Sequence, residues 1–164
     1  MNPTIVAIDP GAYGALVAIY KDGEVEYECM PMTLSKHRVV DAIRVGEFID
    51  RVSHTDVIVV WENVHSFPGQ GVASSFKFGL QTGLVVGAAI SRASGNGVLR
   101  SQHKVTPREW KKHFDLIKTK KEAAVAKMQD LLPNHDFSGL NKQAISGVAD
   151  AYLIGRYFID TNLP

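Results

Sequence analysis

Three acidic residues in this sequence stand where they could hold a metal ion. Asp9 ends the apolar run TIVAID, and Glu62 directly follows the apolar run DVIVVW, so each carboxylate comes at the end of a predicted strand. Asp150 lies in ISGVADAYLIGRYF, where the residues one and two helical turns further on are apolar. A charge beside an apolar stripe is costly unless it is paired or bound to a cation. Carboxylate oxygens suit Mg²⁺, and two such ions can stabilise the attacking water and the leaving oxygen of a phosphodiester.

Each acid also has a simpler structural explanation. Asp9 could cap the glycine loop that follows it. Glu62 could pair with a lysine, and Asp150 could form an ion pair inside the core. The three acids together, two of them at strand ends, favour metal chemistry instead. The loop Gly11–Gly14 in AIDPGAYGAL has almost no side chains, and bare backbone of this kind lets a phosphate approach closely.

Apolar periodicity and turn signals predict the elements that must position these acids. We expect strands over Thr4–Asp9, Ala15–Tyr20, Glu24–Met30 and Asp56–Trp61, and a short last strand over Val98–Ser101. We expect helices over Arg38–Ser53 and Val72–Ser91, from Thr106-Pro107 onward, from the capping-box sequence Thr119-x-x-Glu122 to Leu132, and over Ser146–Ile159. A meander of strands followed by alternating helices and strands predicts an α/β fold around a mixed sheet.

The side-chain patterns of two segments predict how they are covered. In Glu24–Met30, apolar and acidic residues alternate, so we expect one solvated face and a position near the sheet edge. In the predicted helix Val72–Ser91, Gly79, Gly83 and Gly87 recur every four residues on one face. Because glycine lowers helix propensity, we expect another helix to approach this face closely.

The composition indicates a globular protein, and 164 residues suffice for a single domain, which we place at residues 1–164. The N-terminus leads directly into a strand pattern, so no signal peptide is expected. The longest apolar-rich stretch, Leu80–Ile90, is too short to span a bilayer, so no membrane partner is expected. Cys29 is the single cysteine; it excludes an internal disulfide and predicts a reducing cytoplasm as the location.

The charge is distributed unevenly along the chain. Residues 92–127 carry 10 Lys/Arg against 3 Asp/Glu, although the whole chain has a net charge of only +1. A solvated helix face would explain such a basic block. Aromatic residues are interleaved with the bases in residues 100–127, which favours a polyanion partner, and nucleic acid in particular.

The order of these motifs resembles the RuvC-type Holliday junction resolvases of the RNase H-like superfamily, particularly the small phage versions. The resemblance covers nearly the whole chain. It is carried by AIDPGAYGAL (7–16), ENVHSFPGQGVASSFKFG (62–79), VTPREWKKHF (105–114) followed by KTKKEAAVAKMQDLLP (118–133), and GVADAYLIG (147–155). It implies an RNase H-like fold, with a mixed five-stranded sheet flanked by helices.

The resemblance also implies an activity. Asp9, Glu62 and Asp150 match the metal-binding carboxylates of the family, and Lys111 and Lys121 match basic residues near the scissile phosphate. The expected cofactor is a pair of Mg²⁺ ions, for which Mn²⁺ can substitute. The expected reaction is the resolution of four-way junctions, and potentially of other branched DNA, by paired symmetric nicks that leave 5′-phosphates. The glycine-striped helix corresponds to the one used in homodimerisation, which suits a two-fold substrate.

The DNA contacts implied by the resemblance begin at the loop 63–71, which corresponds to the segment that reaches into the junction centre. His65 and Phe67 are its candidates for touching bases. Of each adjacent lysine pair, 111/112 and 120/121, we expect at most one to face the active site. The remaining candidates are polar or basic side chains of the later motifs, namely Gln70, Ser74, Ser75, Lys77, Lys104, Arg108, Lys111, Lys112, Lys118, Lys120 and Lys121.

One departure from the family pattern leaves alternatives open. The family generally has a fourth metal ligand, Asp or His, one helical turn before the last acid, where this chain has Ser146 and Gly147. These small residues are expected to leave open space in front of Asp150. His135 or Asp136 could compensate, or the second metal could bind weakly, or the position could carry an inactivating substitution.

The departure motivates an alternative function, a non-catalytic junction-binding protein with an incomplete metal site. Two other classes fit less well. An actin-like ATP-binding protein needs two halves and a second phosphate loop, for which this chain is too short. A DnaQ-like exonuclease needs a second acid two residues after the first, and that position is Gly11.

Overall fold

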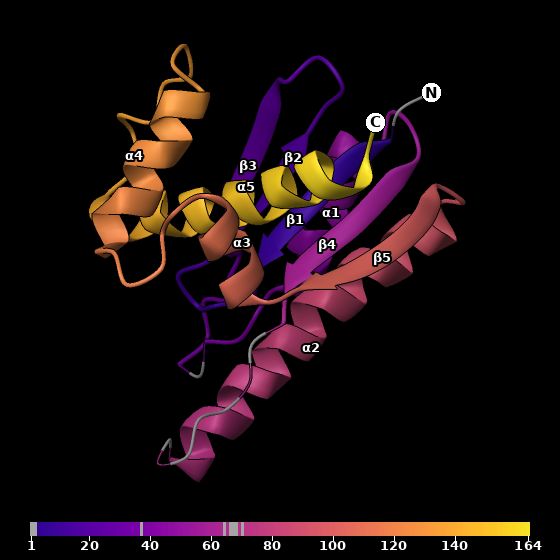
Figure 1. The fold of residues 1–164 in the computed structure, drawn as a ribbon. Helices are drawn as coiled ribbons and strands as arrows, with labels where there is room; N and C mark the ends of the chain where they lie inside the picture. Colours follow the sequence, from indigo (N-terminus) through magenta and orange to yellow (C-terminus); the bar gives the residue numbers. More distant parts are fainter. Residues whose placement is uncertain (1–2, 37, 64, 66–68, 70) are drawn as a thin grey trace.

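The structure is a computed structural model that describes residues 3–36, 38–63, 65, 69 and 71–164. Its centre is a five-stranded mixed sheet with the strand order β3-β2-β1-β4-β5 (Figure 1). β2 is antiparallel to both β1 and β3, whereas β4 is parallel to both β1 and β5. The strands are β1 (Thr4–Asp9), β2 (Ala15–Ile19), β3 (Val25–Cys29), β4 (Val57–Glu62) and β5 (Leu99–Val105).

Helices cover both faces of this sheet. On one face, α5 (Lys142–Asn162) packs across β1 and β2, flanked by α3 (Pro107–His113) and α4 (Lys121–Leu131). On the other face lie α1 (Ala42–Val52) and α2 (Val72–Gly95), which pack against each other. The predicted α/β class with a mixed five-stranded sheet is therefore confirmed.

Burial on both faces explains why the two acidic strands are so apolar. All residues of β1 and β4 are buried except the last of each, Asp9 and Glu62, which are partly exposed. A strand covered on both faces needs a continuous apolar run rather than alternation. The parallel register pairs Ile8 with Trp61, so the two acids that follow them leave the sheet side by side at the same edge.

β3 confirms the predicted sheet-edge position and corrects the prediction of a solvated face. Its apolar residues pack against the core beneath α5. Its acidic residues do not simply face water. Glu28 pairs with Arg44 (2.7 Å) and with Arg51 (3.2 Å), and Glu26 pairs with Arg51 (3.3 Å), so arginines of α1 cover that face.

Several predicted boundaries are wrong. α1 begins at Ala42, where the Asp41 side chain caps it, rather than at Arg38, and α2 continues past Ser91 to Gly95. β5 continues to Val105 because it pairs with β4 along its length, so Lys104 lies on a strand. α5 begins at Lys142, where the Asn141 side chain caps it, so Ser146 lies inside the helix rather than at its start. The Thr119 hydroxyl donates to the Leu116 carbonyl instead of capping α4.

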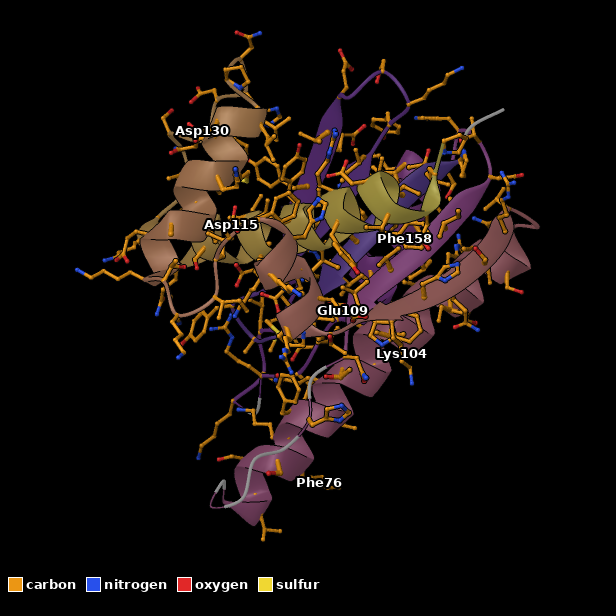
Figure 2. All side chains as sticks on the ribbon, viewed as in Figure 1. Phe76, Lys104, Glu109, Asp115, Asp130 and Phe158 are labelled. Atoms are coloured by element: carbon orange, nitrogen blue, oxygen red, sulfur yellow. The ribbon has the colours of Figure 1, made fainter. Side chains whose placement is uncertain are left out.

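The glycine stripe of α2 is open in this chain. Apart from the backbone of α2 itself, no atom of the described residues lies within 4 Å of a Cβ built at Gly79, Gly83 or Gly87, so no helix of the described part of the chain makes the predicted close approach. Approach by a helix of a second copy stays a prediction. The first half of α2 projects away from the sheet and exposes Val72 and Phe76 (Figures 1 and 2). We refer to residues 72, 76, 79, 80, 83 and 87 as the open face of α2.

In the part of the chain that the structure describes, no helix is both long enough and apolar enough to cross a membrane. Cys29 packs partly buried against the core under α5, and this burial raises the pKa of its thiol.

Candidate active site

Asp9 stands at the end of β1 with its carboxylate turned toward two other acids. The backbone N–H of Gly11 donates to Asp9 Oδ1 (3.1 Å). Burial, together with the negative charges of Glu62 and Asp150, raises the pKa of Asp9 from 3.8 to about 7, although the Gly11 hydrogen bond and Lys111 act in the opposite direction. The capping role that sequence reasoning offered for Asp9 is therefore present. This hydrogen bond does not offset the effects of burial and of the neighbouring acids, which together keep the pKa of Asp9 raised.

Glu62 is held by Trp110, a buried aromatic residue of α3. The indole Nε1 of Trp110 donates to Glu62 Oε1 at 2.9 Å. Burial raises the pKa of Glu62, and the Trp110 hydrogen bond and Lys111 partly offset this. Trp110 is only 1% exposed, so its N–H has no access to water and needs an internal acceptor. A buried tryptophan could therefore be expected from the sequence to need a hydrogen-bond acceptor for its indole N–H. The sequence could not show that this acceptor is Glu62.

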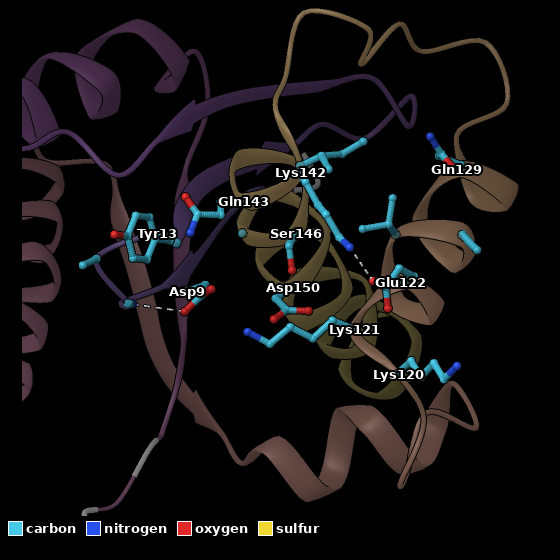
Figure 3. A pocket seen from close by; sticks show the side chains of 17 residues that line it. Asp9, Tyr13, Lys120, Lys121, Glu122, Gln129, Lys142, Gln143, Ser146 and Asp150 are labelled. Carbon is cyan, nitrogen blue, oxygen red and sulfur yellow. Dashed lines mark hydrogen bonds and ion pairs between the residues drawn. The ribbon is translucent and has the colours of Figure 1, made fainter.

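Asp150 projects from α5 toward the same edge of the sheet. Burial, followed by the charge of Glu62, raises the pKa of Asp150 from 3.8 to about 6, while Lys111 and Lys121 lower it. In Figure 3 its carboxylate lies between Ser146 and Lys121. α5 can present a carboxylate here because it crosses β1 and β2 with this turn next to the end of β1.

Two lysines act on the acids. The charge of Lys111 lowers the pKa of Asp9, Glu62 and Asp150, and that of Lys121 lowers the pKa of Asp150. The Lys111 ammonium lies 5.1 Å from the centroid of the Trp110 ring. Thus α3 places Trp110 and Lys111, which are adjacent in sequence, on the same cluster of carboxylates.

Two glycines bring the loop after β1 close to α5. A Cβ at Gly14 would collide with the backbone carbonyl of Asp9, and a Cβ at Gly147 would collide with the carbonyl of Tyr13. At Gly147 itself the loop takes up the space that a side chain would need, whereas the open space predicted in front of Asp150 is present as a cavity that Ser146, Gly147 and Asp150 line together. The small residues let the chain fold tightly around its own acid.

A cavity of about 850 Å³ opens beside Asp9 and Asp150, between this loop, α4 and α5 (Figure 3). Ser146 lines it one turn before Asp150. Glu62 lies outside its lining. The cavity walls are formed by Asp9, Gly11, Ala12, Tyr13, Gly14, Lys120, Lys121, Glu122, Val125, Ala126, Gln129, Lys142, Gln143, Ile145, Ser146, Gly147 and Asp150.

His135 and Asp136 cannot supply the missing fourth ligand. His135 lines a separate cavity together with Asp22, Gly23 and Glu24, in the turn between β2 and β3. That turn is at the far end of β2 from Ala15, the partner of Asp9. The proposed compensation is therefore wrong, because the loop after α4 runs to the opposite end of the sheet.

The donor set suits a divalent cation, although the side chains are not drawn together. As they stand, the described residues contain no group of three or more His, Cys, Asp or Glu side chains arranged to hold a metal ion. The three partly or largely buried carboxylates supply oxygen ligands, and the charge of Glu62 adds to the raised pKa of both Asp9 and Asp150, so a cation here would neutralise negative charge.

The predicted DNA contacts are scattered over the surface around these strand ends. His65 is exposed, whereas Phe67 and Gln70 lie outside the described residues. The Lys104 ammonium lies 5.9 Å from the centroid of the Trp61 ring. Ser75 is partly buried at the start of α2. The exposed candidates are Ser74, Lys77, Lys104, Arg108, Lys112, Lys118, Lys120 and Lys121.

No protein-family model matches the sequence. No curated protein matches it either. Among solved structures, the chain is similar to RuvC of Thermus thermophilus, with a TM-score of 0.56 and 17% identity over 96% of this chain and 95% of that chain. It is also similar to T. thermophilus RuvC in complex with a Holliday junction substrate, with a TM-score of 0.58 and 17% identity over 97% and 96% of the two chains.

A third similar structure is the yeast mitochondrial Holliday junction resolvase Ydc2, with a TM-score of 0.56 and 10% identity over 97% of this chain and 79% of that chain. At these identities the likeness concerns the fold. The strand order and the flanking helices of this chain form the RNase H-like fold that RuvC has.

Proposed function

We propose that this protein is a metal-dependent endodeoxyribonuclease that resolves four-way DNA junctions by paired symmetric nicks. The observation that carries the proposal is the cluster of Asp9, Glu62 and Asp150 at one edge of the sheet. Burial, and after it the negative charge of neighbouring acids, raises the pKa of Asp9 to about 7 and that of Asp150 to about 6. Uncompensated acids of this kind are typical of functional sites. The fold shared with resolvases supports the choice of substrate.

The three carboxylates would hold Mg²⁺, or Mn²⁺ in its place. Such ions lower the pKa of a bound water and stabilise the leaving oxygen of a phosphodiester. Trp110 keeps Glu62 oriented through the 2.9 Å hydrogen bond from its indole. Lys111 and Lys121 contribute positive charge at the point where the scissile phosphate would enter. Cleavage in this arrangement would leave 5′-phosphate and 3′-hydroxyl ends.

Junction binding would use the basic block of residues 92–127 and the start of α2. Phosphate contacts of this kind release counterions, so binding would weaken steeply with salt. A homodimer would match the two-fold symmetry of a four-way junction. The open face of α2 supports this assembly, because its glycines meet no other element of the described chain and its apolar side chains Val72 and Phe76 stay largely exposed. A phage origin and a cytoplasmic location stay predictions.

The alternative function is a junction-binding protein without nuclease activity. It is favoured by Ser146, which stands where the family has an acid or histidine, and by the separation of the carboxylates among the described residues. Both functions predict tight junction binding. Only cleavage distinguishes them.

The test is cleavage of a labelled synthetic four-way junction in Mg²⁺, in Mn²⁺ and in chelator, with linear duplex as the control DNA. Paired symmetric nicks that need both metal and Asp9, and are lost in Asp9→Asn, support the nuclease. Tight binding without cleavage in either metal supports the alternative. A gain of cleavage in Ser146→Asp would then assign the defect to the missing ligand.

A further inference from the structure

Tyr13 is an aromatic residue that the metal chemistry leaves unused. It lies in the tight loop between Asp9 and β2, and 66% of its surface is exposed. Its backbone is held firmly, because its carbonyl packs against Gly147 of α5 where no Cβ would fit. The loop therefore presents a large aromatic ring to solvent, four residues after a candidate metal ligand, from a fixed backbone position.

The cavity beside Tyr13 is larger than a metal site needs and has two chemically different parts. Asp9, Asp150 and Lys121 form the charged part. Apolar side chains and the amides of Gln129 and Gln143 make up most of the remainder, to which Lys120, Glu122 and Lys142 add charged side chains; the apolar residues are Ala12, Val125, Ala126 and Ile145. A volume of about 850 Å³ is in the range of pockets that hold small organic groups.

The charges near the uncharged part are largely satisfied within the protein. Lys142 pairs with Glu122 at 2.8 Å, so neither offers a strong field to a ligand. Tyr13 and Gln143 both line the cavity, and in Figure 3 they are seen on the side of it near Asp9, with Glu122 and Lys120 on the other side. A flat, neutral group with hydrogen-bonding edges fits between an aromatic ring and an amide better than a phosphate does.

We propose that Tyr13 and Gln143 form a nucleobase subsite, which receives the base of the nucleotide adjacent to the cut phosphate. This inference rests on the proposed nuclease function and adds a determinant of cut-site sequence. The ring of Tyr13 stacks on the base, an interaction that every base can make. The amide of Gln143 has both a donor and an acceptor, so it pairs differently with different base edges and favours one of them.

Stacking by Tyr13 and hydrogen bonding by Gln143 make separate contributions to the subsite, and each can be measured. Stacking on one aromatic side chain affects affinity by a factor of about 5 to 150 per base. We expect Tyr13→Ala to lower kcat/KM for cleavage by a factor in that range and Tyr13→Phe, which keeps the ring, to restore most of it. Gln143→Ala should leave the mean rate within a few-fold and make the rates for the four bases more equal.

The experiment compares wild type and these variants on four junctions that differ only in the base pair adjacent to the cut. Ile43→Ala is the control, since Ile43 is 76% exposed on α1 and lies outside the cavity. It should change neither rate nor preference. A second readout needs no cleavage: 2-aminopurine at the adjacent position, bound in chelator, should be quenched by wild type and Tyr13→Phe and not by Tyr13→Ala.

The outcomes separate this inference from the proposed function. If wild type cuts the junctions, and Tyr13→Ala cuts as fast with unchanged base preference and unchanged quenching, the subsite is overturned and the nuclease stands. If wild type cuts no junction in either metal, the proposed function fails, and a nucleobase subsite beside a cut phosphate fails with it. Loss of rate in Tyr13→Phe equal to that in Tyr13→Ala would also overturn it, because stacking would not then be the cause.

Discussion

The hydrogen bond from Trp110 to Glu62 offers a sharp test of how this site is built. Trp110→Phe keeps most of the buried aromatic surface of α3 and removes the only N–H of the side chain. The bond is 2.9 Å long and its acceptor is a partly buried carboxylate. Hydrogen bonds to charged groups contribute about 1.5–3 kcal/mol. Because about 1.4 kcal/mol is a factor of ten, the affinity of Glu62 for a cation should fall by about 10- to 100-fold.

The assay is the Mg²⁺ or Mn²⁺ concentration that gives half-maximal junction cleavage, together with direct binding of Mn²⁺ to the DNA-free protein. We expect both curves to shift to higher metal concentration in Trp110→Phe, with cleavage at saturating metal affected less. Phe114→Leu is the matched control, because Phe114 belongs to the same buried cluster and makes no hydrogen bond to an acid. Equal metal dependence in the two variants would refute the reasoning, since packing alone would then explain the effect.

Three further predictions follow from charge and exposure. Burial raises the pKa of Asp9 from 3.8 to about 7 in the folded protein. Between about pH 4 and 7 the folded, metal-free protein therefore keeps a proton on Asp9 that the unfolded chain has released. The stability of the folded protein consequently falls as the pH rises through that window. Asp9→Asn should therefore stabilise the metal-free protein at pH 8 by up to about 4 kcal/mol and little at pH 4, measured by urea unfolding in chelator; equal effects at both pH values would contradict this. Lys111→Gln should move the pH profile of cleavage further toward alkaline pH than Lys121→Gln does. The reason is that Lys111 lowers the pKa of three acids, whereas Lys121 lowers that of Asp150 alone. Identical pH profiles in the two variants would contradict the positions of these lysines relative to the acids. Gly83→Lys should convert a dimer to a monomer in sedimentation. The unfolding temperature should fall by no more than a few degrees, because a Cβ at this position meets no other element of the described chain. A dimer that persists in this variant would show that the open face of α2 is not part of the interface.

The sequence by itself determined the elements that carry the acids. The stretches Ile5–Ile8 and Val57–Trp61 are apolar at every position, as a strand that is buried on both faces needs. A carboxylate, Asp9 or Glu62, follows each stretch at the end of its strand. The alternation of β3 similarly predicted a sheet edge. These predictions succeeded because the pattern of apolar residues along a short segment reflects which faces of that segment are buried, and this pattern can be seen in neighbouring residues.

The tertiary structure alone decided which residues meet at the site. It brought Trp110 to Glu62 across 48 positions of the sequence, packed the backbone of Tyr13 and Gly14 against Gly147, and carried His135 to the opposite end of the sheet. No local pattern encodes these outcomes. A hydrogen-bond partner, a collision with a Cβ and the direction of a loop all depend on how distant segments pack, and packing is decided by the whole core at once.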